Sequence, residues 1–227
     1  MDKSFLKRIT DCLGSKEERY FSNGFKSIDV IYNDVLYKDG IVSSNIHVKQ
    51  RSSWSKKNGR NLKPHLGTTE FVSISAVIAQ HLLEKEFDLY QDGYKFRDHT
   101  ITDIILDEEK MNSRGNVTLY EEDIQKKGIG AKYDGMILTD YVLVTGQLTQ
   151  ALLYSLNNSD REKSNNMWLR EIDVWCEFPP TEKTCNGEVK FLNMNTLNMS
   201  GETWQSVTLS GSLSNMNSKI KVAQKIN

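Results

Sequence analysis

Residues 69–87, TEFVSISAVIAQHLLEKEF, form the segment that most restricts how this chain can fold. Its first half is apolar nearly all round, because only two serines interrupt the apolar residues. A helix with apolar side chains on every face has to be buried. Thr68 or Thr69 can cap its start, and Glu70 falls in the first turn, where the helix dipole favours an acid. The sequence therefore predicts a buried helix over residues 69–87 whose charged end emerges into water.

A second segment, GQLTQALLYSL at residues 146–156, resembles the first in its apolar and small residues. A strand-like run follows each helix, at residues 99–109 and at residues 167–178. Alternating apolar and polar residues predict further strands in GIVSSNIHVKQ, RGNVTLYEED, GEVKFLNMN, WQSVTLSGSL and KIKVAQKI. An antiparallel sheet that curves around an apolar helix is an α+β arrangement.

The repeated order of helix and strands predicts two copies of one structural plan. Among known architectures it resembles the hot-dog fold, here as a tandem double hot-dog in which curved antiparallel sheets each wrap a buried helix. We expect an N-terminal helical segment at residues 1–19, one hot-dog unit at 20–122 and a second at 123–227, joined in one compact domain. Apolar residues spaced four apart predict the N-terminal helix. A single mixed α+β domain is the alternative.

Positive and negative charges are balanced in this chain. Lys and Arg number 29 and Asp and Glu number 30, which gives a formal net charge of -1. That balance provides no general attraction to nucleic acid or to membrane lipid. No apolar run approaches the ~20 residues that span a bilayer, and the start of the chain lacks the apolar region of a signal peptide. We therefore expect a cytoplasmic protein that binds neither nucleic acid nor membrane.

The three cysteines, Cys12, Cys176 and Cys185, are scattered along the chain. No pair has the spacing of metal ligands, and an odd number argues against a disulfide scaffold. We expect free thiols without a catalytic role, because a cytoplasmic chain stays reduced.

The loop at residues 52–71, SSWSKKNGRNLKPHLGTTEF, leads into the predicted buried helix. Its WSKK run at 54–57 and its LKPHL run at 62–66 resemble the avirulence protein D family. The run YFSNGFKSI at 20–28 resembles the aromatic–Gly–aromatic segment of the same family. The resemblance covers the first half of the chain in its motifs and the second half in its architecture. The family usually opens the helix with Asp, where this chain has Glu70.

The resemblance implies an acyltransferase-like enzyme that makes small acyl-sugar signalling lactones, the syringolides, from a β-ketoacyl thioester and a ketose. More remotely, the chain is similar to hot-dog enzymes that build butyrolactone autoinducers. The implied partners are small acyl and sugar substrates, with the acyl group delivered as a coenzyme A thioester or by an acyl-carrier protein. No metal or redox cofactor is implied, and a homodimer is left open.

His65 is the leading catalytic candidate in this loop. Pro64 restricts the backbone before it, and Gly67 allows a tight turn after it. A histidine there would act as general base, oriented by Glu70, while backbone N–H groups of the helix start hold the thioester oxygen. Glu70 is also a candidate acid–base in its own right. The alternatives are a His65 ring that packs over the helix start and an ordinary helix N-terminal acid, worth ~0.3–1 kcal/mol.

Lys56, Lys57 and Lys63 form a local basic cluster with two nearby arginines in an otherwise neutral chain. Such a cluster can hold the phosphates of a pantetheine arm or of coenzyme A. The alternative is a solvated loop. Trp54 either lines the substrate pocket or has only a packing role in the fold.

In the second predicted unit, TDYVLVTGQLTQALL places Asp140 ahead of a turn and Gln147 and Gln150 in the helix. Hot-dog dehydratases carry a histidine in one unit and a carboxylate in the other, so Asp140 is a candidate for that carboxylate. The two glutamines share one helix face. Their amides need partners in a buried helix, and either substrate or neighbouring strands can supply them.

Other catalytic motifs are absent from the sequence. It has no phosphate-binding Gly-rich loop, Gly-x-Ser-x-Gly elbow or His-Glu-x-x-His run. It also lacks the full His-x-x-x-Gly-x-x-x-x-Pro run of polyketide dehydratases. The resemblance to the avirulence protein D family implies transfer or condensation of a β-ketoacyl chain onto a sugar-like acceptor. The alternatives are a non-catalytic protein that binds an acyl or sugar ligand, and a hot-dog dehydratase or thioesterase.

Overall fold

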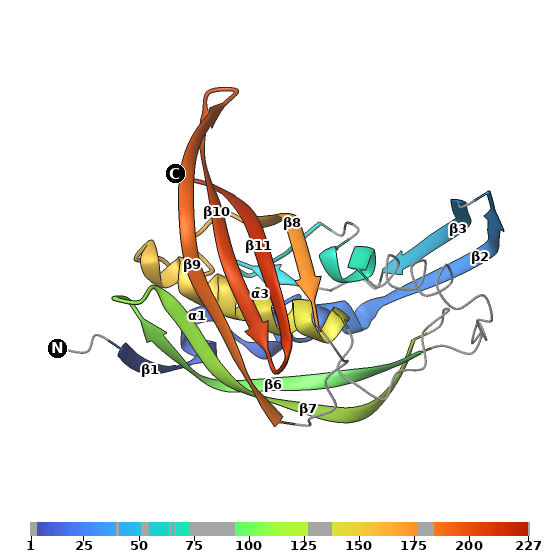
Figure 1. Cartoon of the computed structure of the whole chain (residues 1–227), viewed down its shortest axis with the longest axis horizontal. Coiled ribbons are helices and arrows are strands. Elements are labelled where there is room, and N and C mark those ends of the chain that lie inside the picture. Colours follow the sequence, from blue (N-terminus) through green and yellow to red (C-terminus); the bar gives the residue numbers. More distant parts are fainter. Residues whose placement is uncertain are drawn as a thin grey trace.

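The computed structural model describes residues 4–39, 41–50, 55–63, 65, 67–72, 94–126, 138–176 and 184–226 of the chain. Figure 1 labels the main helices and strands. In chain order the elements are β1 (Ser4–Arg8), α1 (Ile9–Leu13), η1 (Lys16–Glu18), η2 (Gly24–Ser27), β2 (Ile28–Lys38), β3 (Ile41–Gln50), β4 (Lys56–Lys57), β5 (Arg60–Asn61), β6 (Tyr94–Asp107), β7 (Asn112–Lys126), α3 (Leu138–Leu156), β8 (Met167–Trp175), β9 (Thr184–Met199), β10 (Glu202–Leu213) and β11 (Met216–Lys225).

Within the described residues, seven strands form one sheet in the order β1-β6-β7-β9-β10-β11-β8. Neighbouring strands of this sheet run antiparallel. The β2–β3 and β4–β5 hairpins form separate two-stranded sheets. In Figure 1 the large sheet curves around α3, while the β2–β3 hairpin projects away from it. The predicted α+β class with a curved antiparallel sheet is therefore confirmed.

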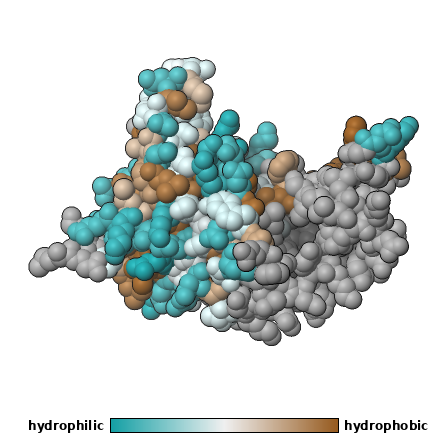
Figure 2. Space-filling model, viewed as in Figure 1, coloured by the Kyte–Doolittle hydropathy of each residue, from teal (hydrophilic) through white to brown (hydrophobic). Residues whose placement is uncertain are grey.

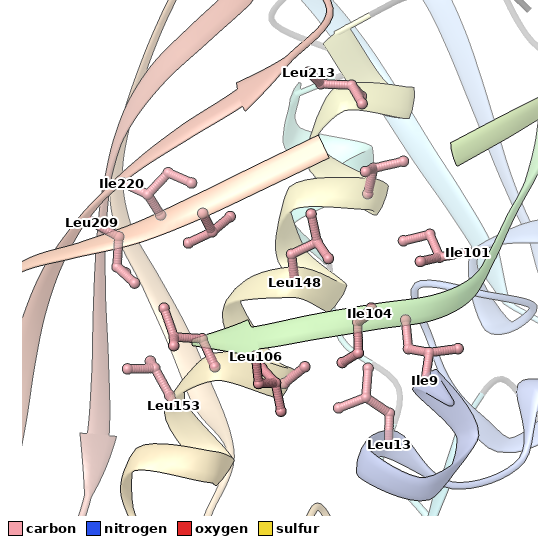
Figure 3. Packing of buried hydrophobic residues seen from close by; sticks show 14 of the residues in the cluster. Ile9, Leu13, Ile101, Ile104, Leu106, Leu148, Leu153, Leu209, Leu213 and Ile220 are labelled. Carbon is pink, nitrogen blue, oxygen red and sulfur yellow. The ribbon is translucent and has the colours of Figure 1, made fainter. Parts of the chain in front are cut away.

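The hydrophobic core lies between α3 and this sheet. Leu148 and Leu153 of α3 pack among residues such as Leu106, Leu209 and Ile220 of the strands (Figure 3). All five are almost fully buried. Burying a side chain of this size stabilises the fold by about 1.5–3 kcal/mol. The core thus ties α3 to strands from both halves of the chain.

The second helix is longer than the sequence predicted. α3 covers Leu138–Leu156 rather than starting at residue 146, because residues 141–144 are apolar and buried. Gly146 does not begin the helix. A Cβ at that position would lie 2.9 Å from Cε2 of Phe21, so the glycine lets the Phe21 ring approach α3 closely. Asp140 consequently lies in the first turn of α3 instead of ahead of a turn.

The N-terminal segment also differs from the predicted helix at residues 1–19. Residues Ser4–Arg8 form β1, which pairs with β6, so they are extended. The helix α1 covers only Ile9–Leu13. Ile9 and Leu13 are four apart, lie on one helix face and are buried in the core. The spacing of the apolar residues therefore predicted the helix correctly at Ile9–Leu13 only. Residues Ser4–Arg8 are a strand instead, because they pair with β6.

The tandem double hot-dog arrangement stays a prediction. Residues 68–72 are helical, and the rest of the predicted helix at 69–87 lies outside the described residues. The boundary expected between residues 122 and 123 falls inside β7. The described strands from both halves of the chain share one continuous sheet.

Apolar side chains are exposed on the β9–β10 hairpin, which projects from the sheet (Figures 1 and 2). On β9 they are Leu192, Met194, Leu197 and Met199, with exposed fractions of 45–53%.

No helix within the described ranges is long and apolar enough to cross a lipid bilayer.

The three cysteines are free thiols, as the sequence predicted. Cys176 is exposed, whereas Cys12 and Cys185 are partly buried. Burial raises the pKa of the Cys12 thiol, and the nearby Lys7 ammonium lowers it by a smaller amount.

We expect iodoacetamide to label Cys176 ahead of Cys12 at about pH 8, because the thiolate is the reactive form. A raised pKa leaves Cys12 with less thiolate, and burial restricts access of the reagent. Mass spectrometry of peptides from samples quenched over time measures the order. Labelling of Cys12 ahead of Cys176 would contradict this expectation.

Candidate functional site

A cavity of about 770 Å³ lies beside β8 and the end of α3. Its volume falls in the range of small-molecule sites, about 300–1,000 Å³. The walls come from the residues after η1, from the loop at 55–72, from α3 and from β8. The side chains that matter for its chemistry are Arg19, Tyr20, Lys57, His65, Gln150, Tyr154, Arg161 and Trp168.

His65 lines this cavity, as expected of a catalytic candidate. Its side chain is exposed, and its Nδ1 lies 3.2 Å from the carbonyl oxygen of Lys63. If Nδ1 donates to that carbonyl, the lone pair of the neutral ring is on Nε2. The ring also contacts Trp168 of β8, with 5.9 Å between centroids. The loop thus holds the imidazole against the cavity wall.

Glu70 is buried behind this wall rather than among the lining residues of the cavity. Its Oε2 accepts a hydrogen bond of 2.5 Å from the Tyr20 hydroxyl, and its Oε1 accepts one of 3.0 Å from Thr69. Tyr20 itself lines the cavity. A Cβ on Gly67 would collide with the Tyr20 ring, 2.8 Å from Cζ, so glycine is needed where the chain turns into the helix. Glu70 is therefore joined to the cavity through Tyr20.

Arg19 contributes a buried positive charge to the cavity wall. Its Nη1 donates a hydrogen bond of 3.0 Å to Oε1 of Gln147. The same oxygen accepts a bond of 2.9 Å from Ser22, and Nε2 of Gln147 donates to the carbonyl of Leu143. Burial, together with repulsion from Arg161, lowers the pKa of Arg19 to about 10, so the guanidinium stays charged at neutral pH. Gln147, which is buried and does not line the cavity, thus orients Arg19.

Arg161 is a second buried cation on the same wall. Its Nη1 pairs with Glu162 at 2.9 Å. Its Nη2 donates to the carbonyl of Glu18 at 3.1 Å and to Oγ of Ser55 at 3.2 Å, and it also bonds the carbonyl of Lys56. One guanidinium therefore joins three segments that are far apart in sequence.

The predicted lysine cluster divides in the structure. Lys57 lines the cavity and donates to the carbonyl of Ser164. Burial lowers the pKa of Lys57, and Arg161 lowers it further. Lys56 and Lys63 are exposed and are not among the lining residues, while Trp54 lies outside the described residues. Of the cluster, Lys57 is the member that the cavity contains.

The polar residues of α3 that the sequence singled out also differ in whether they line the cavity. Gln150 lines the cavity and a smaller hollow of about 70 Å³ next to it. Gln147 and Asp140 are buried, and neither is among the cavity's lining residues. The structure therefore brings His65, Lys57 and Gln150 to one cavity, whereas Glu70, Asp140 and Gln147 are buried and do not line it. The catalytic role of Asp140 stays a prediction.

Sequence reasoning missed Arg19, Arg161, Tyr154 and Trp168. Arg161 stands in the polar run NNSDREKSNN, which has the composition of a solvated loop. Arg19 directly precedes the YFSNGF run, and that position was its one available signal. Burial raises the pKa of Tyr154 to about 12, so its hydroxyl remains a hydrogen-bond donor at neutral pH.

Charges on the cavity wall are mainly positive. Its lining includes the cations Arg19, Lys57, Arg161 and Arg170. The acid Glu171 also lines it, but its Oε2 pairs with Lys221 at 2.7 Å. Such a cavity suits a ligand that carries negative charge, or a reaction in which negative charge develops.

Comparison with known proteins gives one family match. The family model described as Pseudomonas avirulence D protein matches residues 4–89 and 77–227. No curated protein matches the chain. Among solved structures, Cj0977, a sigma28-regulated virulence protein from Campylobacter jejuni, is 13% identical, with a TM-score of 0.34. That alignment covers 73% of this chain and 97% of the other.

Proposed function

The chain belongs to the Pseudomonas avirulence D protein family, and we propose from this membership that it transfers a β-ketoacyl group from a thioester to a sugar-like acceptor. The product is a small acyl-sugar lactone of the syringolide type. The observation that carries the proposal is the cavity, which combines a histidine, buried cations and an apolar wall. We further propose that the fold is a tandem double hot-dog and that the cavity serves as its active site.

The apolar wall of the cavity suits the acyl chain. Met167, Leu169, Ile172 and Val174 of β8 line it and pack at the edge of the core. Each methylene group of an acyl chain that leaves water gains about 0.8 kcal/mol. We assign the acyl chain to this wall because the buried cations Arg19 and Arg161 come from other segments of the lining.

His65 acts as the general base in this proposal. It removes the proton from the acceptor hydroxyl as that oxygen attacks the thioester carbonyl. A C–O bond forms, the C–S bond breaks, and His65 returns the proton to the departing thiolate. Negative charge on the carbonyl oxygen develops in a cavity whose wall is mainly cationic, which stabilises the transition state.

Lactone formation then needs only the groups already on the product. The acidic carbon between the two carbonyls of the acyl group loses a proton and bonds to the ketose carbonyl carbon. The ketose oxygen takes up that proton, so no oxidant, reductant or metal enters the balance.

Glu70 has a positioning role in this proposal, because it fixes the Tyr20 hydroxyl at the cavity wall. The proposal gives no step to Asp140.

Metabolite analysis tests the proposal in cells. Cells that express the protein are expected to contain acyl-sugar lactones that are missing from cells expressing His65→Ala at the same level. High-resolution mass spectrometry of extracts measures the difference. Identical extracts would instead favour a non-catalytic protein that binds an acyl or sugar ligand in the same cavity.

A further inference from the structure

We infer that Arg19 and Arg161 form a subsite in this cavity that binds the phosphate of the acyl donor's phosphopantetheine arm. The identity of the donor rests on the proposed function. The phosphate itself is inferred from the two arginines and their surroundings. This subsite differs from the lysine cluster of the sequence motif, of which the cavity includes Lys57 alone.

Both arginines are buried while lining the cavity, with exposed fractions of 5% for Arg19 and 8% for Arg161. A buried cation needs a compensating anion or a full set of hydrogen bonds. Arg161 has Glu162 at 2.9 Å and three acceptors in addition. Arg19 forms no ion pair with a carboxylate of the described residues, so its charge is left for a ligand to compensate.

The hydrogen bonds of Arg19 are also incomplete. Its Nη1 is held by Gln147, whereas its Nε is buried and has no hydrogen-bond partner among the described residues. A buried donor without a partner costs about 1–3 kcal/mol, and more when it is charged. Gln147 already fixes one nitrogen of the guanidinium. Binding of an anion therefore costs little further side-chain entropy.

A phosphate fits this wall better than a single carboxylate. Lys57 adds a third cation, and burial, together with repulsion from Arg161, lowers the pKa values of Arg19 and Lys57. A phosphate relieves this repulsion with several acceptor oxygens at once, and guanidinium groups match those oxygens in geometry. The phosphate of a pantetheine arm is covalently joined to the thiol that carries the acyl group, so it would enter the cavity with the thioester.

Isothermal titration calorimetry with two probes tests the subsite. The probes are 4′-phosphopantetheine and pantetheine, which differ only in the phosphate. The wild-type protein is expected to bind the phosphorylated probe about 10–100-fold more tightly, as expected when charge-assisted hydrogen bonds are added. Arg19→Gln should lose most of this preference and leave the affinity for pantetheine unchanged. Arg19→Lys should keep part of it, because the charge remains.

Arg170→Gln is the matched control, because Arg170 also lines the cavity but is exposed. It removes the same charge and should keep most of the preference for the phosphorylated probe. Equal affinities of the wild-type protein for the two probes would overturn the inference. A preference that survives Arg19→Gln, or that Arg170→Gln abolishes equally, would also overturn it. An affinity for inorganic phosphate equal to that for phosphopantetheine would overturn the assignment to the acyl donor.

The subsite and the proposed reaction can fail separately. An N-acetylcysteamine thioester carries no phosphate, so turnover of this substrate tests the chemistry without the subsite. Turnover with no preference for the phosphorylated probe would reject the subsite alone. Circular dichroism and thermal unfolding of each variant establish that a lost preference does not come from a lost fold.

Discussion

His65→Ala is expected to lower acyl transfer by roughly 10²–10⁴-fold, the usual contribution of a general base. The protein should remain folded, because the His65 side chain is exposed and contributes little to the core. The measurement is the initial rate of thiol release from a β-ketoacyl thioester in the presence of a ketose, with folding checked by circular dichroism.

Lys63→Ala is the matched control for this variant. Lys63 is exposed on the same loop and does not line the cavity, so its removal should leave the rate within about twofold of wild type. Added imidazole should restore part of the activity of His65→Ala, because a general base can be supplied in solution where a cavity is open. Undiminished transfer by His65→Ala would remove His65 from the mechanism.

Leu148→Ala should destabilise the protein by about 2–5 kcal/mol, as for other leucines lost from a packed core. Leu148 is fully buried where α3 meets the sheet, and Figure 3 shows its side chain among those of the strands. The substitution removes those contacts and leaves a cavity. Urea unfolding followed by circular dichroism measures the change in the free energy of unfolding.

Leu192→Ala is the corresponding control on the surface. Leu192 is 53% exposed on β9, so its loss should change the free energy of unfolding by no more than about 0.5 kcal/mol. Similar stabilities of Leu148→Ala and wild type would show that α3 does not anchor the core.

The strands could be predicted from the sequence because their apolar and polar residues alternate. In β11, for example, buried residues alternate with partly buried or exposed ones along Met216–Lys225. The start of α3 could not be placed, since Gly146 has the appearance of a helix boundary. Glycine stands at this position because the ring of Phe21, a residue from a distant segment, approaches α3 closely there. β1 was missed because its residues are extended through pairing with β6, and their own sequence does not alternate strongly.

The candidate site was predictable where one short motif carried it. His65 and Lys57 stand in the loop that resembles the family, and the structure places both at the cavity. Arg161 was not predictable, because it meets the carbonyl of Glu18 across 143 positions of sequence. A polar run such as NNSDREKSNN does not reveal that one of its arginines is buried. Long-range contacts of this kind arise from the packing of the whole chain.

Incubation of the purified protein with a β-ketoacyl N-acetylcysteamine thioester, with and without a ketose, tests the central claim most directly. Liquid chromatography with mass spectrometry follows the free thiol and the acylated sugar together. We predict thiol release that depends on the ketose, with one acyl-sugar formed for each thiol released. Binding of the thioester without thiol release, or release that yields only the free acid regardless of ketose, would contradict the claim that this cavity catalyses acyl transfer to a sugar.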